Sequence, residues 1–232
     1  MVSTGIDGNN RRGISGLAFT STPTTPVAGY YAWWDATQIV GVADGASLTT
    51  WSDSGPNAHT LTSSGTAPLY FKTTPAKLIG GKPAVWFTAA GQLATTGTAF
   101  GTAQPLTWFA VGLSSNPATT QILVSDTLGQ VQILYVSSHF EAFGGTALAG
   151  GTTDSSAHAI GMIFNGASSS VQVDGTTVAS GNAGANSQSA QMDLGGDSLV
   201  GALGEVVLYA SALSPGNMAT MHTYLKNKWG TP

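Results

Sequence analysis

The carboxylates are the first candidates for chemistry, because glycoside hydrolysis needs a pair of them flanking the scissile bond. The chain contains only two glutamates, Glu141 and Glu205. Neither has an acidic residue two or four positions away, where a strand would place it on the same face. Glu205 precedes the apolar run Val206–Tyr209, so we expect a rim residue at a strand end. The sequence therefore predicts no catalytic residue and no enzyme.

The histidines and two oxygen-rich loops are the candidates for metal binding. Calcium prefers oxygen ligands such as carboxylates and carbonyls. Asp53, Ser54 and Asn57 lie in one such loop, and Asp193 and Asp197 lie in another. Asp and Asn in loops commonly bond their own backbone, so turns are the favoured interpretation and calcium stays the alternative. The histidine spacing fits no metal site and predicts surface or strand-edge positions for His59, His139, His158 and His222.

Aromatic rings are the remaining binding candidates, because sugars stack on exposed rings beside polar loops. Trp33 and Trp34 are adjacent, and successive residues of a strand point to opposite faces. One of them can enter the core. The other needs a cover, for which a ligand, the N-terminal segment and a neighbouring subunit are the alternatives. Trp86 and Trp108 lie in apolar runs, and we expect both to be buried.

Short β-type runs alternate with Gly, Asn, Asp and Pro from Tyr30 onward, which is the pattern of an all-β sandwich. Alternation is strict in Ser170–Val173. Asp174-Gly175 then supplies a type I′ turn, and Thr176–Ala179 returns antiparallel. The other clear strands are predicted at Ala84–Thr88, Leu106–Leu113, Gln121–Ser125, Val131–Val136, Ala159–Phe164 and Leu203–Tyr209.

One short helix is predicted over 214–229. Ser214 is a suitable N-cap, and Pro215 fits the first helical position, where its missing N–H has no partner to lose. Lys226 and Lys228 lie in the last turn, and Gly230 can adopt the left-handed conformation that ends a helix. The apolar side, which we expect to pack on the sandwich, carries Met218, Met221, Leu225 and Trp229.

Residues 1–27 are rich in Gly, Ser, Thr, Asn and Pro, which predicts an extended N-terminal arm before a single domain over 28–232. Two alternatives stay open for the arm. It is a disordered tail, or it orders on a partner through paired arginines and apolar anchors. The candidate partner-binding residues are Arg11, Arg12, Ile14, Leu17 and Phe19, with Ile6 as a further anchor.

A series of sequence blocks between about Tyr30 and Gly230 resembles bacterial and phage laminin-G-like jelly-roll domains. The blocks are Tyr31–Ala36, Ala43–Gly45, Trp51–Asn57, Gly81–Phe87, Gln104–Val111, Val173–Gly175, Gly204–Tyr209 and Leu225–Gly230, in the expected order. The resemblance implies a concanavalin A-like jelly roll of two antiparallel sheets. It implies much less about function, because this fold serves lectins, adhesins, glycanases and virion proteins.

The composition indicates a protein that packs against neighbours. Charged residues make up 8% of the chain, against about a quarter in ordinary soluble domains, so the surface offers little repulsion to association. The net charge of −4, without a basic stripe, argues against nucleic acid. There is no cysteine, no signal-peptide pattern in residues 1–25 and no apolar run of membrane-spanning length. We expect assembly in the cytoplasm, without membrane insertion, a metal or another cofactor.

These features predict a non-enzymatic structural protein of a tailed-phage virion, either a minor tail protein or a capsid decoration protein. The expected partners are other virion proteins, further copies of the chain and a host-surface glycan. The alternative is a carbohydrate-binding adhesion module of a bacterial surface protein. A glycan-cleaving enzyme is disfavoured because the acidic cluster is missing. Tail or capsid location and the identity of the glycan stay open.

Overall fold

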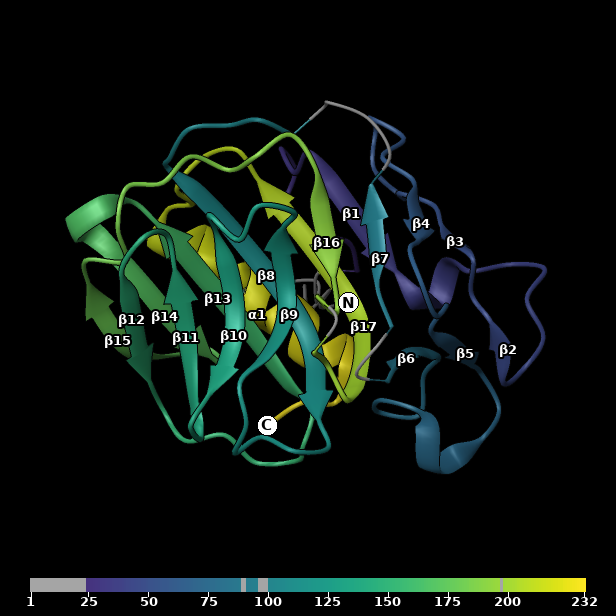
Figure 1. Ribbon diagram of the computed structural model, residues 1–232. Coiled ribbons are helices and arrows are strands. Elements are labelled where there is room, and N and C mark those ends of the chain that lie inside the picture. Colours follow the sequence, from purple (N-terminus) through teal and green to yellow (C-terminus); the bar gives the residue numbers. More distant parts are fainter. Residues whose placement is uncertain (1–23, 89–90, 96–99, 197) are drawn as a thin grey trace, which may run out of the picture.

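The computed structural model describes residues 24–88, 91–95, 100–196 and 198–232. In this part of the chain, short strands pair antiparallel into two facing sheets, and one helix lies outside them (Figure 1). The predicted antiparallel two-sheet sandwich with a C-terminal helix is confirmed. No helix among the described residues is long and apolar enough to span a membrane.

The strands divide between a first sheet and a second sheet. Among the described residues, the first sheet runs in the order β15 (Thr176–Gly181), β14 (Ser169–Val173), β13 (His158–Phe164), β8 (Leu106–Ser114), β17 (Gly201–Tyr209), β6 (Ala84–Phe87), β5 (Leu69–Phe71) and β2 (Ala46–Ser47), with β1 (Ala32–Asp35) also paired to β17. The second sheet runs in the order β12 (Ala147–Gly150), β11 (His139–Phe143), β10 (Gln132–Val136), β9 (Gln121–Asp126), β16 (Met192–Leu194), β7 (Leu93–Thr95), β4 (Leu61–Ser63) and β3 (Thr50–Trp51). Three short 3₁₀ turns also lie in the described residues, namely η1 (Ala36–Gln38), η2 (Pro75–Lys77) and η3 (Gly166–Ser168).

The sequence prediction located the longer strands well. Both ends of each predicted strand lie within two residues of the corresponding ends of an observed strand. Asp174 and Gly175 both have positive φ, +51° and +84°, as a type I′ turn requires. The strands of two or three residues were not predicted, because so short a run carries too little alternation to be recognised. β1, β11 and β12, which have four or five residues, were missed as well.

β17 is the central strand of the first sheet, and all of its residues are buried. β8 pairs along one side of it. The other side is shared, because β6 pairs with Gly201–Leu203 and β1 pairs with Glu205–Leu208. The register against β8 shifts at Gly204, where an added methyl group would lie 2.7 Å from the Trp229 ring. A glycine at this position therefore lets the helix approach the sheet closely.

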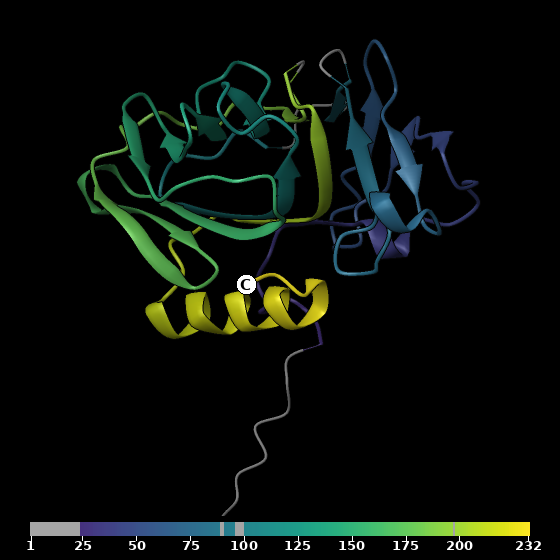
Figure 2. The same cartoon turned by 90° about the horizontal axis from the view of Figure 1, so that it is seen from below.

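The helix α1 (Pro215–Trp229) lies across the outer face of the first sheet, on the side away from the second sheet (Figure 2). The Ser214 hydroxyl accepts a hydrogen bond from the Asn217 N–H at 3.3 Å, and Gly230 has a left-handed φ of +64°. The predicted caps are therefore confirmed. The predicted packing is confirmed as well, because the four apolar side chains are all buried, namely Met218, Met221, Leu225 and Trp229.

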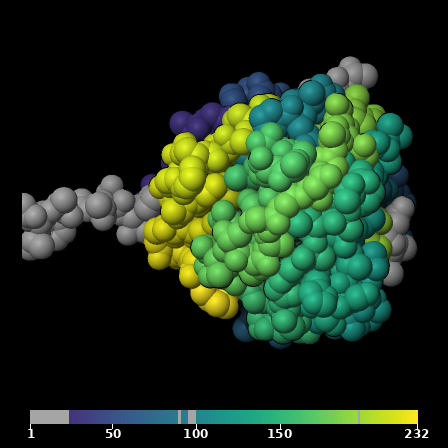
Figure 3. All heavy atoms as spheres, turned by 90° about the vertical axis from the view of Figure 1, so that its left-hand side faces the viewer, coloured from purple at the N-terminus to yellow at the C-terminus, as the bar shows by residue number. Residues whose placement is uncertain are grey.

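The two sheets enclose an aromatic-rich core. Trp34 from β1, Trp51 from β3 and Trp108 from β8 are each at most 1% exposed. At one edge of the sandwich β12 contacts β15, so the two sheets close on each other there, and α1 packs alongside (Figure 3).

The described end of the predicted arm already contacts the domain. Pro26 is buried. The Tyr209 hydroxyl donates to the Val27 carbonyl at 2.8 Å, and the Val27 N–H points to the Met221 sulfur at 3.2 Å. Contact with the helix and β17 thus begins one or two residues before position 28. Residues 1–23 lie outside the described part of the chain.

Candidate functional site

Glu205 is completely buried inside β17, so the prediction of a rim residue at a strand end was wrong. The strand begins before it, and α1 covers this face of the sheet. Its Oε1 accepts hydrogen bonds from Trp33 Nε1 at 2.5 Å and the Tyr224 hydroxyl at 2.6 Å. Its Oε2 accepts from Trp229 Nε1 at 2.6 Å and lies 2.8 Å from Lys228 Nζ. We call these five residues, together with Asp35, the Glu205 cluster.

The charge of Lys228 offsets part of the negative charge in the Glu205 cluster. Asp35 lies opposite Glu205 in the β1–β17 pairing, and its Oδ2 is 2.6 Å from Lys228 Nζ. Burial raises the pKa of Glu205, and the Lys228 ammonium opposes that rise. Four donors aimed at two oxygens favour the ionised carboxylate. Because Glu205 is out of reach of solvent, it attaches the helix to the sheet and cannot contact a substrate.

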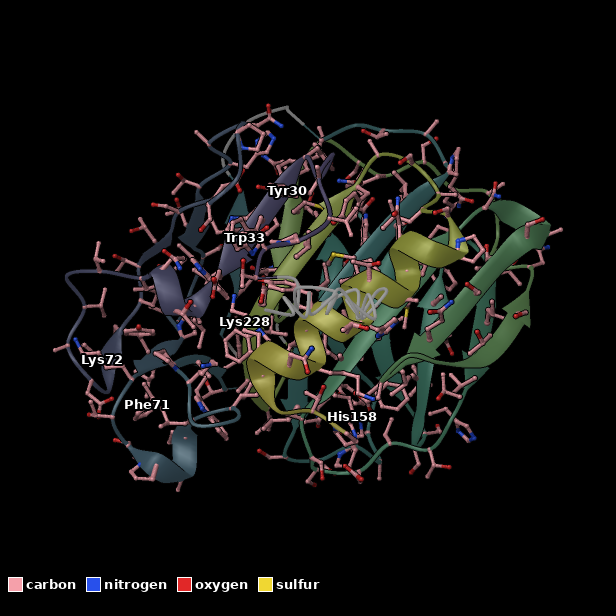
Figure 4. All side chains as sticks on the ribbon, turned by 180° about the vertical axis from the view of Figure 1, so that it is seen from behind. Tyr30, Trp33, Phe71, Lys72, His158 and Lys228 are labelled. Atoms are coloured by element: carbon pink, nitrogen blue, oxygen red, sulfur yellow. The ribbon has the colours of Figure 1, made fainter. Side chains whose placement is uncertain are left out.

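The two adjacent tryptophans point to opposite faces, as predicted. Trp34 is fully buried between the sheets, and its Nε1 donates to the His59 carbonyl at 2.8 Å. Trp33 is half-buried on the outer face, with the Tyr30 ring edge-on at 5.6 Å and Lys228 Nζ 5.6 Å from its centroid. Figure 4 shows Tyr30, Trp33 and Lys228 on the same side of α1. The cover that Trp33 needs is therefore supplied in part by this chain's own side chains.

Trp86 and Trp108, both predicted to be buried, differ in their exposure. Trp108 is buried, as expected. Trp86 is only partly buried, which corrects the expectation for that residue. Its Nε1 donates to the Lys77 carbonyl at 2.5 Å, and Lys77 Nζ lies 3.8 Å from its ring centroid. The ring thus lies beneath η2 on the outer face of the first sheet instead of between the sheets.

A hollow of about 290 Å³ lies next to the Glu205 cluster, with which it shares Asp35. The Asp35 side chain starts η1, because its Oδ1 accepts from the Thr37 N–H at 2.9 Å and the Thr37 hydroxyl at 2.8 Å. The chain then loops back toward β3. We call this cavity the η1 hollow; it is lined by Asp35, Gln38, Ile39, Val40, Val42, Thr50, Trp51, Ser52, Asp53 and Ser54.

Asp53 organises the loop on one side of the η1 hollow. Its Oδ1 accepts from the backbone N–H of Trp33 at 2.8 Å and of Gly55 at 2.6 Å, and its Oδ2 accepts from the His59 N–H at 3.1 Å. The bond to Gly55, two residues on, is the backbone turn that we expected at this loop. A carboxylate has about four acceptor positions. Asp53, which is half-buried, uses three of them and keeps one for a further donor, whereas the carboxylate of Asp35 is buried and is already bonded by Thr37 and Lys228.

The rest of the η1 hollow combines hydroxyl groups with aliphatic surface. Within the described residues, the side-chain hydroxyls of Thr50, Ser52 and Ser54 make no hydrogen bond. Ile39 and Val42 form an apolar wall, and Val40 is 88% exposed, the highest value among the large apolar side chains described. An exposed apolar side chain beside unengaged polar groups is the chemistry of a ligand site.

The predicted candidate residues are distributed unevenly over the structure. The arm residues Ile6, Arg11, Arg12, Ile14, Leu17 and Phe19 lie outside the described part of the chain, as does Asp197. Asp193 accepts a hydrogen bond from the Gln92 side chain. Within the described residues, no group of three or more His, Cys, Asp or Glu is arranged to hold a metal ion.

Two of the four histidines are buried, which corrects the expectation of surface positions. His158 Nδ1 is 2.6 Å from Asp174, and its Nε2 is 3.1 Å from the exposed Asp154. His222 is 2% exposed on the inner side of α1, and neither ring nitrogen has a hydrogen-bond partner. His59 is half-buried and His139 is exposed. The carboxylates around His158 are remote in sequence or in a loop, so spacing alone gave no sign of them.

Sequence reasoning missed most of the η1 hollow. Of its lining residues, only Asp53 and Ser54 had been singled out, as calcium candidates. The available signal was the pair Ile39-Val40, which is apolar yet lies in a loop ended by Gly41. An apolar pair in a loop predicts either a buried anchor or an exposed contact. The structure shows that Val40 is exposed.

Comparison with known proteins identifies the fold. No family model matches the chain, and no curated protein sequence matches it either. Solved structures do match. A sialidase from Trypanosoma rangeli is 17% identical with a TM-score of 0.55, and the match covers 89% of this chain and 34% of the sialidase. This chain therefore spans about a third of that enzyme.

Two further matches are separate domains. Domain 4 of AbnA, a GH43 extracellular arabinanase from Geobacillus stearothermophilus solved with arabinotriose, is 13% identical with a TM-score of 0.55. The match covers 78% of this chain and all of that domain. The binding domain of Paraclostridial Mosquitocidal Protein 1 is 12% identical with a TM-score of 0.57, over 81% of this chain and 54% of that one. At such low sequence identity, the structural matches establish a shared jelly-roll β-sandwich fold and do not by themselves assign a function.

Proposed function

We propose that this chain is a non-catalytic carbohydrate-binding module and that the η1 hollow is its sugar site. The observation that carries the proposal is the lining of the hollow. An aliphatic wall, unengaged hydroxyls and the half-buried Asp53 carboxylate, which keeps one acceptor position, meet in one cavity. A sugar has the matching chemistry, because the C–H face of its ring is apolar and its edge carries hydroxyl donors and acceptors.

The fold is consistent with this role. The arabinanase domain was solved with arabinotriose, and the toxin domain is described as a binding domain. Both have the architecture that this chain adopts, so a binding module is the function class that fold and cavity support together. In this proposal the half-exposed Trp33 and Tyr30, next to Asp53, give a longer glycan a ring surface beside the hollow.

The absence of catalysis is part of the proposal. Hydrolysis of a glycosidic bond needs one protonated carboxyl as general acid and one carboxylate as base or nucleophile. Asp35 and Asp53 line the hollow, and each accepts three hydrogen bonds, one of those to Asp35 coming from Lys228. Glu205 is buried beneath α1. Neither carboxyl group of the hollow therefore has the apolar, donor-free surroundings that keep a general acid protonated.

The test is a binding screen with the full chain against neutral plant, microbial and animal glycans, followed by calorimetry on the best ligand. Val40→Asp removes apolar contact at the hollow, and because Val40 is 88% exposed the fold should persist. Leu128→Asp is the matched control, since Leu128 is 71% exposed in the β9–β10 turn. We expect Val40→Asp to weaken binding at least about tenfold and Leu128→Asp to leave it unchanged. Equal affinity in both variants would place the sugar elsewhere.

A second candidate function is attachment within a tailed-phage virion, as a minor tail or capsid decoration protein that presents this head to a host surface. Two observations favour it, namely a charged fraction of only 8% and the Gly-, Ser- and Thr-rich residues 1–27. The partners would be virion proteins and further copies of the chain. Deleting residues 1–23, which leaves the buried Pro26 and the contacts of Val27 in place, tests this role. The head should still fold and bind sugar, whereas incorporation into particles should fail; full incorporation of the truncated chain would refute it.

A further inference from the structure

We infer that the η1 hollow accepts one neutral sugar residue and discriminates against sugars that carry a carboxylate. This rests on the proposed function and narrows it to a ligand class. The size of the cavity, the charge of its lining and the pattern of acceptors each support the inference.

The size of the hollow limits how much of a glycan can enter. Sites for drug-sized ligands usually measure about 300–1,000 Å³. The η1 hollow measures about 290 Å³, at the lower end of that range. One monosaccharide ring fits such a space, and a run of several residues does not. The residue inside the hollow is therefore a chain end or a side branch, with the rest of the glycan outside.

The charge of the lining is negative. Asp35 and Asp53 contribute carboxylates, and none of the lining residues is a cation. The ammonium group of the Glu205 cluster, that of Lys228, already contacts the carboxylates of Asp35 and Glu205. Lys72 lies outside the lining, where its exposed Nζ donates to the Val42 carbonyl at 2.8 Å. A ligand carboxylate in the hollow would therefore meet the like charge of Asp53 at short range, with no cation among the lining residues to compensate it.

The remaining acceptor position points to the same conclusion. Asp53 is only half-buried and keeps one position, which can be filled only by a donor such as a sugar hydroxyl. A uronic acid replaces a hydroxymethyl donor with two acceptor oxygens. It therefore has one donor fewer to offer the lining, and its added acceptor oxygens have no donor to gain from a carboxylate.

The apolar part of the lining sets no charge requirement. Ile39, Val40 and Val42 present methyl groups, which pack against ring C–H groups of any sugar. Discrimination between neutral and acidic sugars must then come from the carboxylates, and a change of rim charge should alter it without abolishing binding.

The experiment compares matched pairs that differ only at C6. Methyl galactoside and methyl galacturonide form one pair, and methyl glucoside and methyl glucuronide the other. Affinity is measured by calorimetry or ligand-observed NMR at pH 7 and low salt, where screening is weak. In the pair whose neutral member binds, we expect the acidic member to bind at least about tenfold more weakly. Raising the salt concentration should narrow the difference.

A charge variant provides the second measurement. Thr50 is exposed at the rim of the hollow, on an edge strand, so Thr50→Lys adds a cation without disturbing the core. Thr176→Lys is the matched control, because Thr176 is exposed on the edge strand β15 and does not line the hollow. We expect Thr50→Lys to improve binding of the acidic sugar severalfold and Thr176→Lys to change nothing.

The outcomes separate the inference from the function on which it rests. If the neutral sugar binds and its acidic partner binds equally well or better, the function stands and the inference is overturned. If Thr50→Lys leaves the neutral-to-acidic ratio unchanged, the lining charge is not the cause and the inference is also overturned. If no neutral glycan binds in the screen or the paired assay, the proposed function itself fails.

Discussion

Asp35 and Glu205 lie directly opposite each other across the β1–β17 pairing, and a single ammonium group, that of Lys228, contacts both carboxylates. The three residues come from the first strand, the last strand and the helix of the described chain. Their side chains are 1%, 0% and 16% exposed, so neither carboxylate has water to replace a lost partner. The attachment of α1 to the sheet thus depends on one cation as well as on apolar packing.

Lys228→Met should destabilise the protein by about 3–5 kcal/mol, because two buried carboxylates lose their counter-charge. The measurement is the free energy of unfolding from urea titration. Lys226→Met is the control: Lys226 is in the same turn and donates to the Asp174 carbonyl, but it contacts no buried carboxylate. Its loss should cost less than about 1 kcal/mol. Similar losses in the two variants would show that the Glu205 cluster does not need its cation.

Gly204→Ala should cost about 1–3 kcal/mol, because the new methyl group would lie 2.7 Å from the Trp229 ring and force the helix away from the sheet. Near-ultraviolet circular dichroism of the tryptophans and thermal melting report the change. Gly216→Ala is the control, since Gly216 lies in the first turn of α1 with nothing within 4 Å of the added atom. That variant should be neutral or slightly stabilising. A Gly204→Ala protein as stable as wild type would contradict the close approach.

Acid should destabilise the protein through His222. Burial lowers the pKa of His222 to about 4, against an unperturbed value of 6.5. Between pH 6.5 and 4 the His222 side chain therefore binds a proton in the unfolded chain but not in the folded chain. The free energy of unfolding falls over this range by about 3 kcal/mol in all. His222→Phe should remove this part of the acid sensitivity, as seen in melting temperatures between pH 7 and 4. His139→Phe, at an exposed position, should leave the pH dependence as it is.

His158 should act in the opposite direction. Burial opposes its charge, but the hydrogen bonds to Asp174 and Asp154 prevail and raise the pKa of His158 above 6.5. The contribution of His158 to stability is then fully present below pH 6.5 and is lost as the pH rises through the folded-state pKa. His158→Gln should make the melting temperature depend less on pH above 6.5. NMR titration of the imidazole checks the direction, and a pKa below 6.5 would refute it.

No hydrolysis of β-glucans or bacterial cell-wall polysaccharides is expected, because both carboxylates that line the η1 hollow are surrounded by hydrogen-bond donors and neither is placed as a general acid. A reducing-end assay over long incubation is the measurement. Turnover that disappears in Asp53→Asn or Glu205→Gln, while those variants keep the wild-type fold, would overturn the non-catalytic assignment.

Features fixed by neighbouring residues were predictable from the sequence. The hairpin turn at Asp174-Gly175 depends on two adjacent positive φ angles, and the helix depends on Ser214 at its start and Gly230 at its end. Such signals need only a short window of sequence. A short window of sequence also gave the wrong position for Glu205. The apolar run after this residue suggested a strand end, whereas β17 begins before it, at Gly201.

Features made by distant residues could not be predicted. Asp35 and Lys228 are 193 positions apart, and they meet only because β1 and α1 both lie against β17. The η1 hollow joins the segment 38–42 to the segment 50–54 through loop geometry that no periodicity encodes. His222 adjoins the apolar stripe of α1, yet its type alone suggested a surface position.

The position of β17 in the chain has a consequence for how the protein is made. This strand lies between β8 and β6 in the sheet, yet it is synthesised long after both. Until it leaves the ribosome, the first sheet exists as two separate halves, each with an open edge where β17 belongs. A premature stop before residue 201 would therefore yield two exposed half-sheets and not a shorter sandwich, so late truncations should aggregate in the cell.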